Sequence, residues 1–188
     1  MTTEAFDSSL VLAALQREHL VPDILPASLN ASDISVALAI RFPTSGAEAA
    51  LGNELLVADT QERPVASWPE VDGTSYTLVC LDPDAPTRDG PIYRSFRHWV
   101  LPGLSSANGI ADGADVTPWR TPGPRPASGI HRYTFLLFEE PAAGFKVPEG
   151  ATEWGAQLEE RRSWDALKFA QTYNLKLVGA NFFLVKAL

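Results

Sequence analysis

Cysteine is almost absent from this chain, which has a single residue of the type, Cys80. One cysteine cannot form a disulfide within the chain and cannot supply the thiolate cluster of a structural metal site. It stands inside the apolar run 76–81, where a buried and inert thiol is more typical than a reactive one. The sequence therefore indicates a reducing compartment, and we expect a cytoplasmic protein.

Long apolar runs and an excess of basic residues are also lacking. No segment approaches the roughly 20 apolar residues needed to span a bilayer, and the run 10–15 is too short for the core of a secretion signal. Lys and Arg number 15 against 23 Asp and Glu, which gives a formal net charge of −8. A field of this sign repels nucleic acid and anionic lipid. We expect no membrane span and no nucleic-acid partner, and local geometry must capture any bound anion.

Several motifs with well-defined chemistry are missing as well. The chain has neither the glycine fingerprints that cradle nucleotide phosphates nor the Gly-x-Ser-x-Gly turn of serine hydrolases. His98 and His131 each lie in a strand next to a proline-rich loop, but neither has a second His or Cys at metal-ligand spacing. We therefore expect no metal site and no cofactor.

The residues that are present are typical of a folded, strand-rich protein. Apolar residues make up 45% of the 188-residue chain and charged residues 20%. A chain of this length can build one substantial core but not two ordinary domains joined by a linker. Residues 1–188 are therefore expected to form a single domain.

Short runs rich in β-branched and aromatic residues predict a series of strands. The expected strands are residues 34–42, 55–57, 75–81, 96–101, 131–139 and 177–185. Helices are expected only at residues 9–18 and 163–173, and Asn174 can end the second by adopting the left-handed conformation. Five of the 15 prolines fall between residues 102 and 128, which predicts a long loop. This pattern favours a mainly β fold with peripheral helices, an antiparallel β-sandwich or barrel.

The segment Asp82-Pro83-Asp84 is the first candidate for a functional site. It places two carboxylates at the end of an apolar strand and stiffens them with prolines, here and at Pro86. An Asp-Pro-Asp segment of this kind is also compatible with a solvated turn, in which the side chains cap their own backbone. Both Asp82 and Asp84 are candidate ligand contacts.

A second candidate lies at His131 and Tyr133, which alternation places on one face of a strand with Arg132 on the other. His98 stands similarly inside an apolar strand. Polar groups at the end of a core-facing stripe suit a ligand pocket, although a structural histidine would look the same in sequence. Two imidazoles with ordinary pKa values would make such a site sensitive to pH. Asp82 and His131 can act as an acid–base pair if the fold brings them within hydrogen-bonding reach.

These motifs resemble those of the phosphatidylethanolamine-binding protein family. The family's Asp-Pro-Asp-Ala-Pro-Ser/Thr-Arg signature stands at residues 82–88, its His-Trp pair at 98–99, and its Gly-x-His-Arg-Tyr/Phe signature at 129–133. The resemblance extends from about residue 75 to the C-terminus, and more loosely over the N-terminal third. It implies an antiparallel β-sandwich with a pocket for phosphate, acetate or phosphoethanolamine-like groups.

The resemblance also implies which residues line that pocket. They are Asp82, Asp84, Pro86, His98, Gly123, Pro124, His131 and Tyr133. Backbone N–H groups in the surrounding loops would capture the anion, and the family suggests a cis bond at Asp82-Pro83. The chain departs from the family at residues 100–103, and Trp119 and Thr121 stand near the place of a common tyrosine, which reshapes one wall.

Three functions are open at this point. The first is a regulatory module that binds a small anionic ligand, with a kinase or a protease as its protein partner. The second is an enzyme or accessory of fungal type acting on carboxylate or maleic-anhydride intermediates, in which Asp82, His98, His131 and Tyr133 would be catalytic. The third is a carboxypeptidase-type protease inhibitor that uses an exposed N-terminal arm, residues 1–26, as its contact element.

Overall fold

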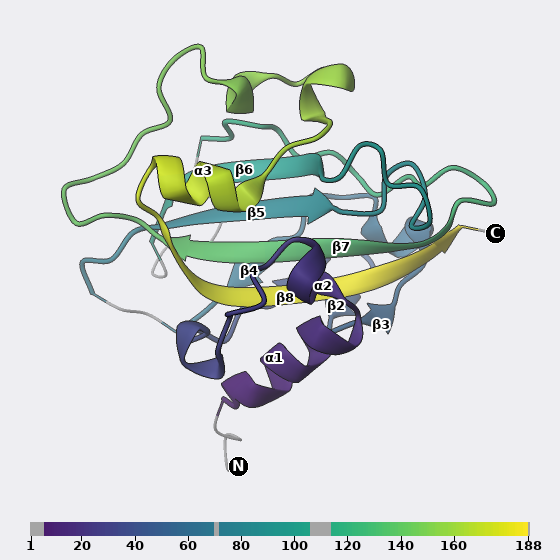
Figure 1. Ribbon diagram of the computed structural model, residues 1–188, viewed down its shortest axis with the longest axis horizontal. Coiled ribbons are helices and arrows are strands. Elements are labelled where there is room, and N and C mark those ends of the chain that lie inside the picture. Colours follow the sequence, from purple (N-terminus) through teal and green to yellow (C-terminus); the bar gives the residue numbers. More distant parts are fainter. Residues whose placement is uncertain (1–5, 70–71, 106–113, 188) are drawn as a thin grey trace.

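The computed structural model describes residues 6–69, 72–105 and 114–187, and its regular structure is mostly β (Figure 1). The larger sheet has the strand order β3-β8-β7-β5-β6. Its strands are β3 (Asn53–Glu54), β5 (Tyr76–Asp82), β6 (Phe96–Leu104), β7 (Gly129–Glu139) and β8 (Lys176–Ala187). The smaller sheet has the order β2-β1-β4, with β1 at Ala39–Arg41, β2 at Glu48–Ala49 and β4 at Val65–Ser67. The expectation of a mainly β protein with peripheral helices is confirmed.

The helices are short and cover one face of the larger sheet (Figure 1). They are α1 (Ser8–Arg17), α2 (Leu20–Asp23) and α3 (Ala166–Thr172), and the 3-10 turns are η1 (Ala31–Asp33), η2 (Val57–Thr60), η4 (Thr152–Trp154) and η5 (Glu159–Arg161). The carboxylate of Asp165 caps α3 by accepting from the N–H groups of Leu167 and Lys168. Asn174 follows with a φ of 55°, so the expected left-handed termination is confirmed.

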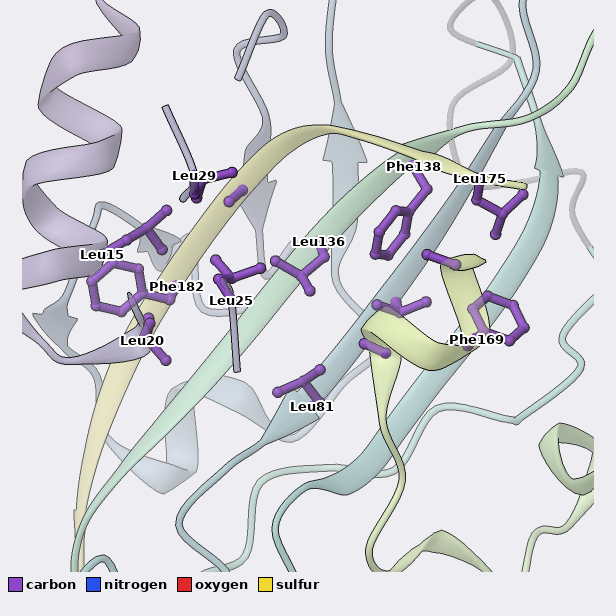
Figure 2. Packing of buried hydrophobic residues seen from close by; sticks show 14 of the residues in the cluster. Leu15, Leu20, Leu25, Leu29, Leu81, Leu136, Phe138, Phe169, Leu175 and Phe182 are labelled. Carbon is purple, nitrogen blue, oxygen red and sulfur yellow. The ribbon is translucent and has the colours of Figure 1, made fainter. Parts of the chain in front are cut away.

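Apolar side chains fill the space between the helices and this face of the sheet (Figure 2). Leu15 of α1 packs near Phe182 of β8, and Phe169 of α3 lies on the same face as Leu136 of β7. Leu15, Leu136 and Phe182 have no exposed surface. Burial of such side chains contributes about 2 to 3 kcal/mol each to folding.

A second apolar cluster covers the opposite face of the larger sheet. It contains Ile40 and Ala66 of the smaller sheet together with Cys80, Phe135 and Phe183 of the larger one. Both faces of the central strands are therefore covered, so every position of β5 and all but the ends of β7 are buried. Cys80 lies fully inside this cluster, so the expectation of a buried cysteine is confirmed, and burial raises the pKa of its thiol.

The smaller sheet and its surroundings differ from the sequence-based expectation. Only residues 39–41 of the expected strand 34–42 form a ladder, and the expected strand 55–57 is wrong, because β3 ends before it and η2 begins within it. β2 and β4 were not expected, since two or three residues are too few to establish a period. The pair β3–β8 is parallel, unlike the antiparallel pairs elsewhere in both sheets.

The expected long loop 102–128 begins later than its prolines indicated. β6 continues through Pro102 to Leu104, and Thr117 forms a bridge with Val100. Pro102 is tolerated because β6 is the edge strand of its sheet. Residues 106–113 of the expected loop lie outside the described residues.

The N-terminal segment is packed down from residue 6 onward. Leu15 and Leu20 have no exposed surface and Leu25 is 1% exposed. An exposed arm over residues 1–26 is therefore wrong for residues 6–26, and residues 1–5 lie outside the described residues. His19 lies between α1 and α2 with a φ of 58°. No helix in the described part of the chain is long and apolar enough to cross a membrane.

The packing of α1 predicts a difference between two of its leucines. Leu15→Ala should lower the free energy of unfolding by about 2 to 5 kcal/mol, because it opens a cavity in the core. Leu10→Ala in the same helix is the matched control, since Leu10 is 63% exposed and its loss should change stability by less than about 0.5 kcal/mol. Urea unfolding measures both. Equal effects of the two substitutions would show that α1 does not dock as described.

Candidate functional site

Three adjacent strands of the larger sheet, β7, β5 and β6, bring polar residues together where β5 ends and where β6 and β7 begin. β5 pairs antiparallel with both β6 and β7, so the end of β5 at Asp82 meets the starts of the other two strands. Asp82 lies opposite Phe96, and His98 follows two residues into β6. His131 and Tyr133 lie near the start of β7. Segments distant in sequence therefore meet because of strand direction.

A cavity of about 270 Å³ lies at this end of the three strands. Among the sequence-predicted site residues, those that line it are Asp82, Pro86, His98, Gly123, Pro124, His131 and Tyr133. Asp84 is absent from the lining. Of the two residues expected to reshape one wall, Thr121 lines the cavity. Trp119 does not, and stacks instead on Phe135 at a ring-centroid distance of 6.3 Å.

Asp82 and His131 form a buried pair on the cavity wall. Nδ1 of His131 lies 2.7 Å from Oδ2 of Asp82, and Nε2 lies 2.9 Å from the hydroxyl oxygen of Ser128. The expected hydrogen-bonding reach between Asp82 and His131 is therefore confirmed. The other carboxylate oxygen of Asp82 accepts from the N–H of Asp84 at 2.8 Å.

Both ring nitrogens of His131 have a partner in this pair. The Ser128 hydroxyl oxygen lies 2.6 Å from the carbonyl oxygen of Arg125 as well as 2.9 Å from Nε2 of His131. Asp82 on one side and Ser128 on the other therefore fix the orientation of the imidazole ring.

His98 provides a different kind of group. Its Nδ1 lies 2.8 Å from the carbonyl oxygen of Arg120, which can only accept, so Nδ1 is the protonated nitrogen. Burial lowers the pKa of His98 to about 4, an effect that Asp82 opposes and that Arg161 and Arg120 reinforce. His98 is therefore neutral at physiological pH. The expectation that it switches charge in this range is wrong, because burial costs the imidazolium its hydration.

Tyr133 completes the inner part of the cavity. Its ring lies 5.1 Å from that of His98 and 6.4 Å from that of His131, measured between centroids. Burial raises the pKa of the phenol far above its usual range, and Asp82 adds to this, while the backbone N–H of Gly123 acts in the opposite direction. The hydroxyl stays protonated and is a hydrogen-bond donor at neutral pH.

Asp84 has a structural position instead of the expected ligand contact. It is fully buried, and its oxygens accept from Nε of Arg132 at 2.8 Å, from a terminal nitrogen at 2.5 Å and from the Arg132 backbone at 3.0 Å. Arg132 also contacts Asp23 and the carbonyl of Glu18. The expected alternation is thus confirmed, because His131 and Tyr133 line the cavity while Arg132 points to the other face.

Three arginines in the lining were not expected from the sequence. They are Arg120, Arg125 and Arg162. Arg162 stacks over the ring of Tyr93 at 4.2 Å, which holds its guanidinium at the cavity. The prolines around Arg125 were a signal of a fixed loop, but no sequence pattern distinguishes Arg120 or Arg162.

The cis bond expected at Asp82-Pro83 is instead at Ala85-Pro86, and sequence does not discriminate between two prolines in one loop.

No group of three or more His, Cys, Asp or Glu side chains placed to hold a metal occurs within residues 6–69, 72–105 and 114–187. A concave cavity lined by both polar and apolar residues is the general form of small-ligand sites in proteins.

Residues 42–183 match the family model described as phosphatidylethanolamine-binding protein, and the chain belongs to this family. The resemblance seen in the sequence is therefore confirmed.

Solved structures show the same fold. A phosphatidylethanolamine-binding protein from Plasmodium vivax is similar at 24% identity and a TM-score of 0.77, over 94% of this chain and 97% of that one. One from Plasmodium falciparum is similar at 24% identity and a TM-score of 0.74, over 93% and 96%. A carboxypeptidase Y inhibitor complexed with its cognate proteinase is similar at 23% identity and a TM-score of 0.78, over 99% and 98%.

The buried neutral His98 predicts a pH dependence of stability. Between its unfolded pKa near 6.5 and its folded pKa of about 4, the unfolded chain binds a proton that the native protein does not. The free energy of unfolding should therefore fall as the pH falls through this window, by about 3 kcal/mol from this residue when complete. Above the unfolded-state pKa of His98, this residue causes no loss of unfolding free energy.

The effect is measured by urea unfolding from pH 7.5 to 4. His98→Asn, which keeps a donor for the Arg120 carbonyl, should have a shallower pH slope than the wild type. His19→Asn is the control, because His19 is exposed and the left-handed conformation suits asparagine. Identical slopes for the wild type and His98→Asn would contradict a buried neutral imidazole.

Proposed function

We propose that this protein binds a small anion, such as phosphate, a carboxylate or a phosphoethanolamine-like group, in the cavity at the end of β5, and that binding has a regulatory role. The observation that carries the proposal is the charge balance of the lining. Arg120, Arg125 and Arg162 contribute three positive charges to the lining, against the single carboxylate of Asp82.

This balance explains how a chain with a formal net charge of −8 can hold an anion. The field of the whole molecule is unfavourable at long range, but it is screened beyond about 8 to 10 Å at physiological salt. Guanidinium groups outnumber the one carboxylate in the cavity lining, and the Tyr133 hydroxyl is available to donate a hydrogen bond. Short-range groups of this kind determine anion binding more than net charge does.

We also infer that residues 1–188 act as one β-sandwich domain in the cytoplasm. The second apolar cluster supports the sandwich, because it joins side chains of both sheets. The single reduced cysteine supports a reducing compartment.

An enzymatic role has less support. Both ring nitrogens of His131 are occupied, by Asp82 and by Ser128, so neither is directed at a substrate as a general base. A collapse of product formation in His131→Ala would be required to favour it.

Protease inhibition is retained as a second candidate, because the fold is shared with a carboxypeptidase Y inhibitor complexed with its proteinase. The packing of residues 6–26 argues against an exposed arm as the contact element. A protease is therefore a partner to test after the small ligand.

Titration calorimetry with inorganic phosphate tests the main proposal. The wild type should bind phosphate saturably at one site without turnover. Arg120→Gln should weaken binding by about three- to tenfold, because a charged donor at the rim is lost. Arg41→Gln, in the smaller sheet and outside the cavity lining, should bind as the wild type does. The absence of any phosphate binding to the wild type would refute the proposal.

A further inference from the structure

Another cavity, of about 360 Å³, is lined by residues of η4, of α3 and of the segment just before α3. It shares no lining residue with the cavity at the end of β5. Its lining differs in character as well, because it combines aromatic rings with charged side chains of both signs. The rings are those of Trp164, Phe169 and Tyr173, and the charged side chains are those of Glu153, Asp165 and Lys168.

Glu153 is a buried carboxylate that faces this cavity. The residue is 6% exposed, and within the described part of the chain its carboxylate has one hydrogen bond, from Nε1 of Trp164 to Oε1 at 2.9 Å, and no ion pair. Its other oxygen, Oε2, is not among the enclosed polar atoms that lack a partner, which are Nε1 of Trp68 and Nε1 of Trp119. Because Glu153 lines the cavity, Oε2 is open to it. Buried carboxylates are normally paired with a cation, so this arrangement suits a cationic ligand.

The cations of the chain near Glu153 do not neutralise it by direct contact. Arg97 is buried, but its guanidinium donates to three other acceptors at 2.8 to 3.0 Å. Lys168 is exposed and forms no ion pair with Glu153. In the cavity lining, the two carboxylates of Glu153 and Asp165 and the one ammonium of Lys168 leave a net charge of −1. Burial raises the pKa of Tyr173 and the charge of Glu153 adds to this, so the field of Glu153 extends along the cavity.

The aromatic rings of the lining favour an alkylated ammonium ion. The ring centroids of Trp164 and Phe169 are 5.4 Å apart and those of Phe169 and Tyr173 are 5.2 Å apart, with Phe169 on α3 (Figure 2). Ring faces attract cations, and Trp164 already holds Arg97, whose guanidinium carbon lies 5.6 Å from the ring centroid. An unsubstituted ammonium would lose its hydrogen bonds to water here, because one open carboxylate oxygen cannot satisfy three donors.

From this geometry we propose that the cavity between η4 and α3 is a second binding site, which takes a small alkylated ammonium ion. Glu153 is its counter-charge, and the rings of Trp164, Phe169 and Tyr173 form its walls. The site goes beyond anion binding at the end of β5 and does not depend on it. Alkylated ammonium groups occur in free amines and in choline-type headgroups, and the test covers both sources.

NMR titration of the isotope-labelled wild type tests the requirement for charge. The probes are choline and neopentyl carbinol, its neutral isostere, in which carbon replaces the quaternary nitrogen. Choline should bind at least about tenfold more tightly, because only the cation gains from Glu153 and from the ring faces. The indole N–H resonance of Trp164, which is bonded to Glu153, should shift with choline, whereas the backbone resonance of Gly123 in the other cavity should not. Equal affinities of the two probes would overturn the proposal.

Glu153→Gln removes the charge and keeps an acceptor for the Trp164 indole. Its affinity for choline should fall at least about tenfold, to that of the neutral isostere. Glu140→Gln is the matched control, because Glu140 is also buried, at 7% exposure, but lies outside the cavity lining, so choline should bind as it does to the wild type. Wild-type affinity in Glu153→Gln would contradict the assignment of the counter-charge.

Tyr173→Leu keeps the proposal testable should Glu153→Gln not fold. Tyr173 is only half-buried, and its replacement removes one aromatic wall while it keeps an apolar one. Choline should bind at least about threefold more weakly to this variant, and the neutral isostere should change by less than about twofold. Equal losses for the two probes would show that the wall does not recognise a cation.

Phosphocholine carries the same ammonium group on a phosphate and distinguishes the two sources. With binding followed at the Trp164 indole, tighter binding of choline supports the site with a free amine as its ligand, and tighter binding of phosphocholine supports it with a headgroup. Binding of neither would overturn the proposal. Inorganic phosphate should not displace choline, because the two cavities share no lining residue, so the failure of one site leaves the other intact.

Discussion

The buried ion pair between Asp84 and Arg132 is the interaction on which the site depends. Both side chains are fully buried, and the carboxylate accepts from the side chain and from the backbone of the same arginine. This pair joins the loop after β5 to the start of β7. Arg132 then extends the connection to Asp23 and to the Glu18 carbonyl, so the N-terminal segment is joined to the same point.

On the other side of the loop, Asp82 contacts His131, one residue before Arg132. Asp82 therefore holds His131 on one face of β7, and Asp84 holds the next residue, Arg132, on the opposite face. The first contact forms the wall of the cavity and the second fixes the loop from behind. The carboxylate that positions the imidazole is outnumbered in the cavity lining by three arginines. The rigidity of the site thus comes from one short motif.

Much of this arrangement could be predicted from the sequence. Alternation along residues 131–133 correctly separated the cavity face from the face of Arg132, because the period of a strand is independent of its tertiary contacts. The expectation that residues 82–88 and 129–133 line one cavity came from the family resemblance and not from the alternation of side chains. The match to the family model confirms that resemblance.

Other features could not be predicted, for identifiable physical reasons. Asp82 and Asp84 have the same chemistry two residues apart, and only the position of Arg132 makes one a wall of the cavity and the other a buried support. The protonation of His98 depends on burial and on the Arg120 carbonyl, neither of which leaves a trace in the sequence. Strands as short as β2 and β4 exist only because the partner strand β1 pairs with them.

The most direct test of this account is the stability of Asp84→Asn, measured by urea unfolding beside Asp89→Asn, an exposed neighbour in the same loop. In Asp84→Asn the partly exposed Asp23 is the remaining counter-charge of the buried Arg132. The loss of unfolding free energy should therefore lie near the lower end of the about 3 to 5 kcal/mol that breaking a buried ion pair costs. Asp89→Asn should change it by less than about 0.5 kcal/mol. A fully stable Asp84→Asn protein would contradict the claim that the Asp84–Arg132 pair holds the site together.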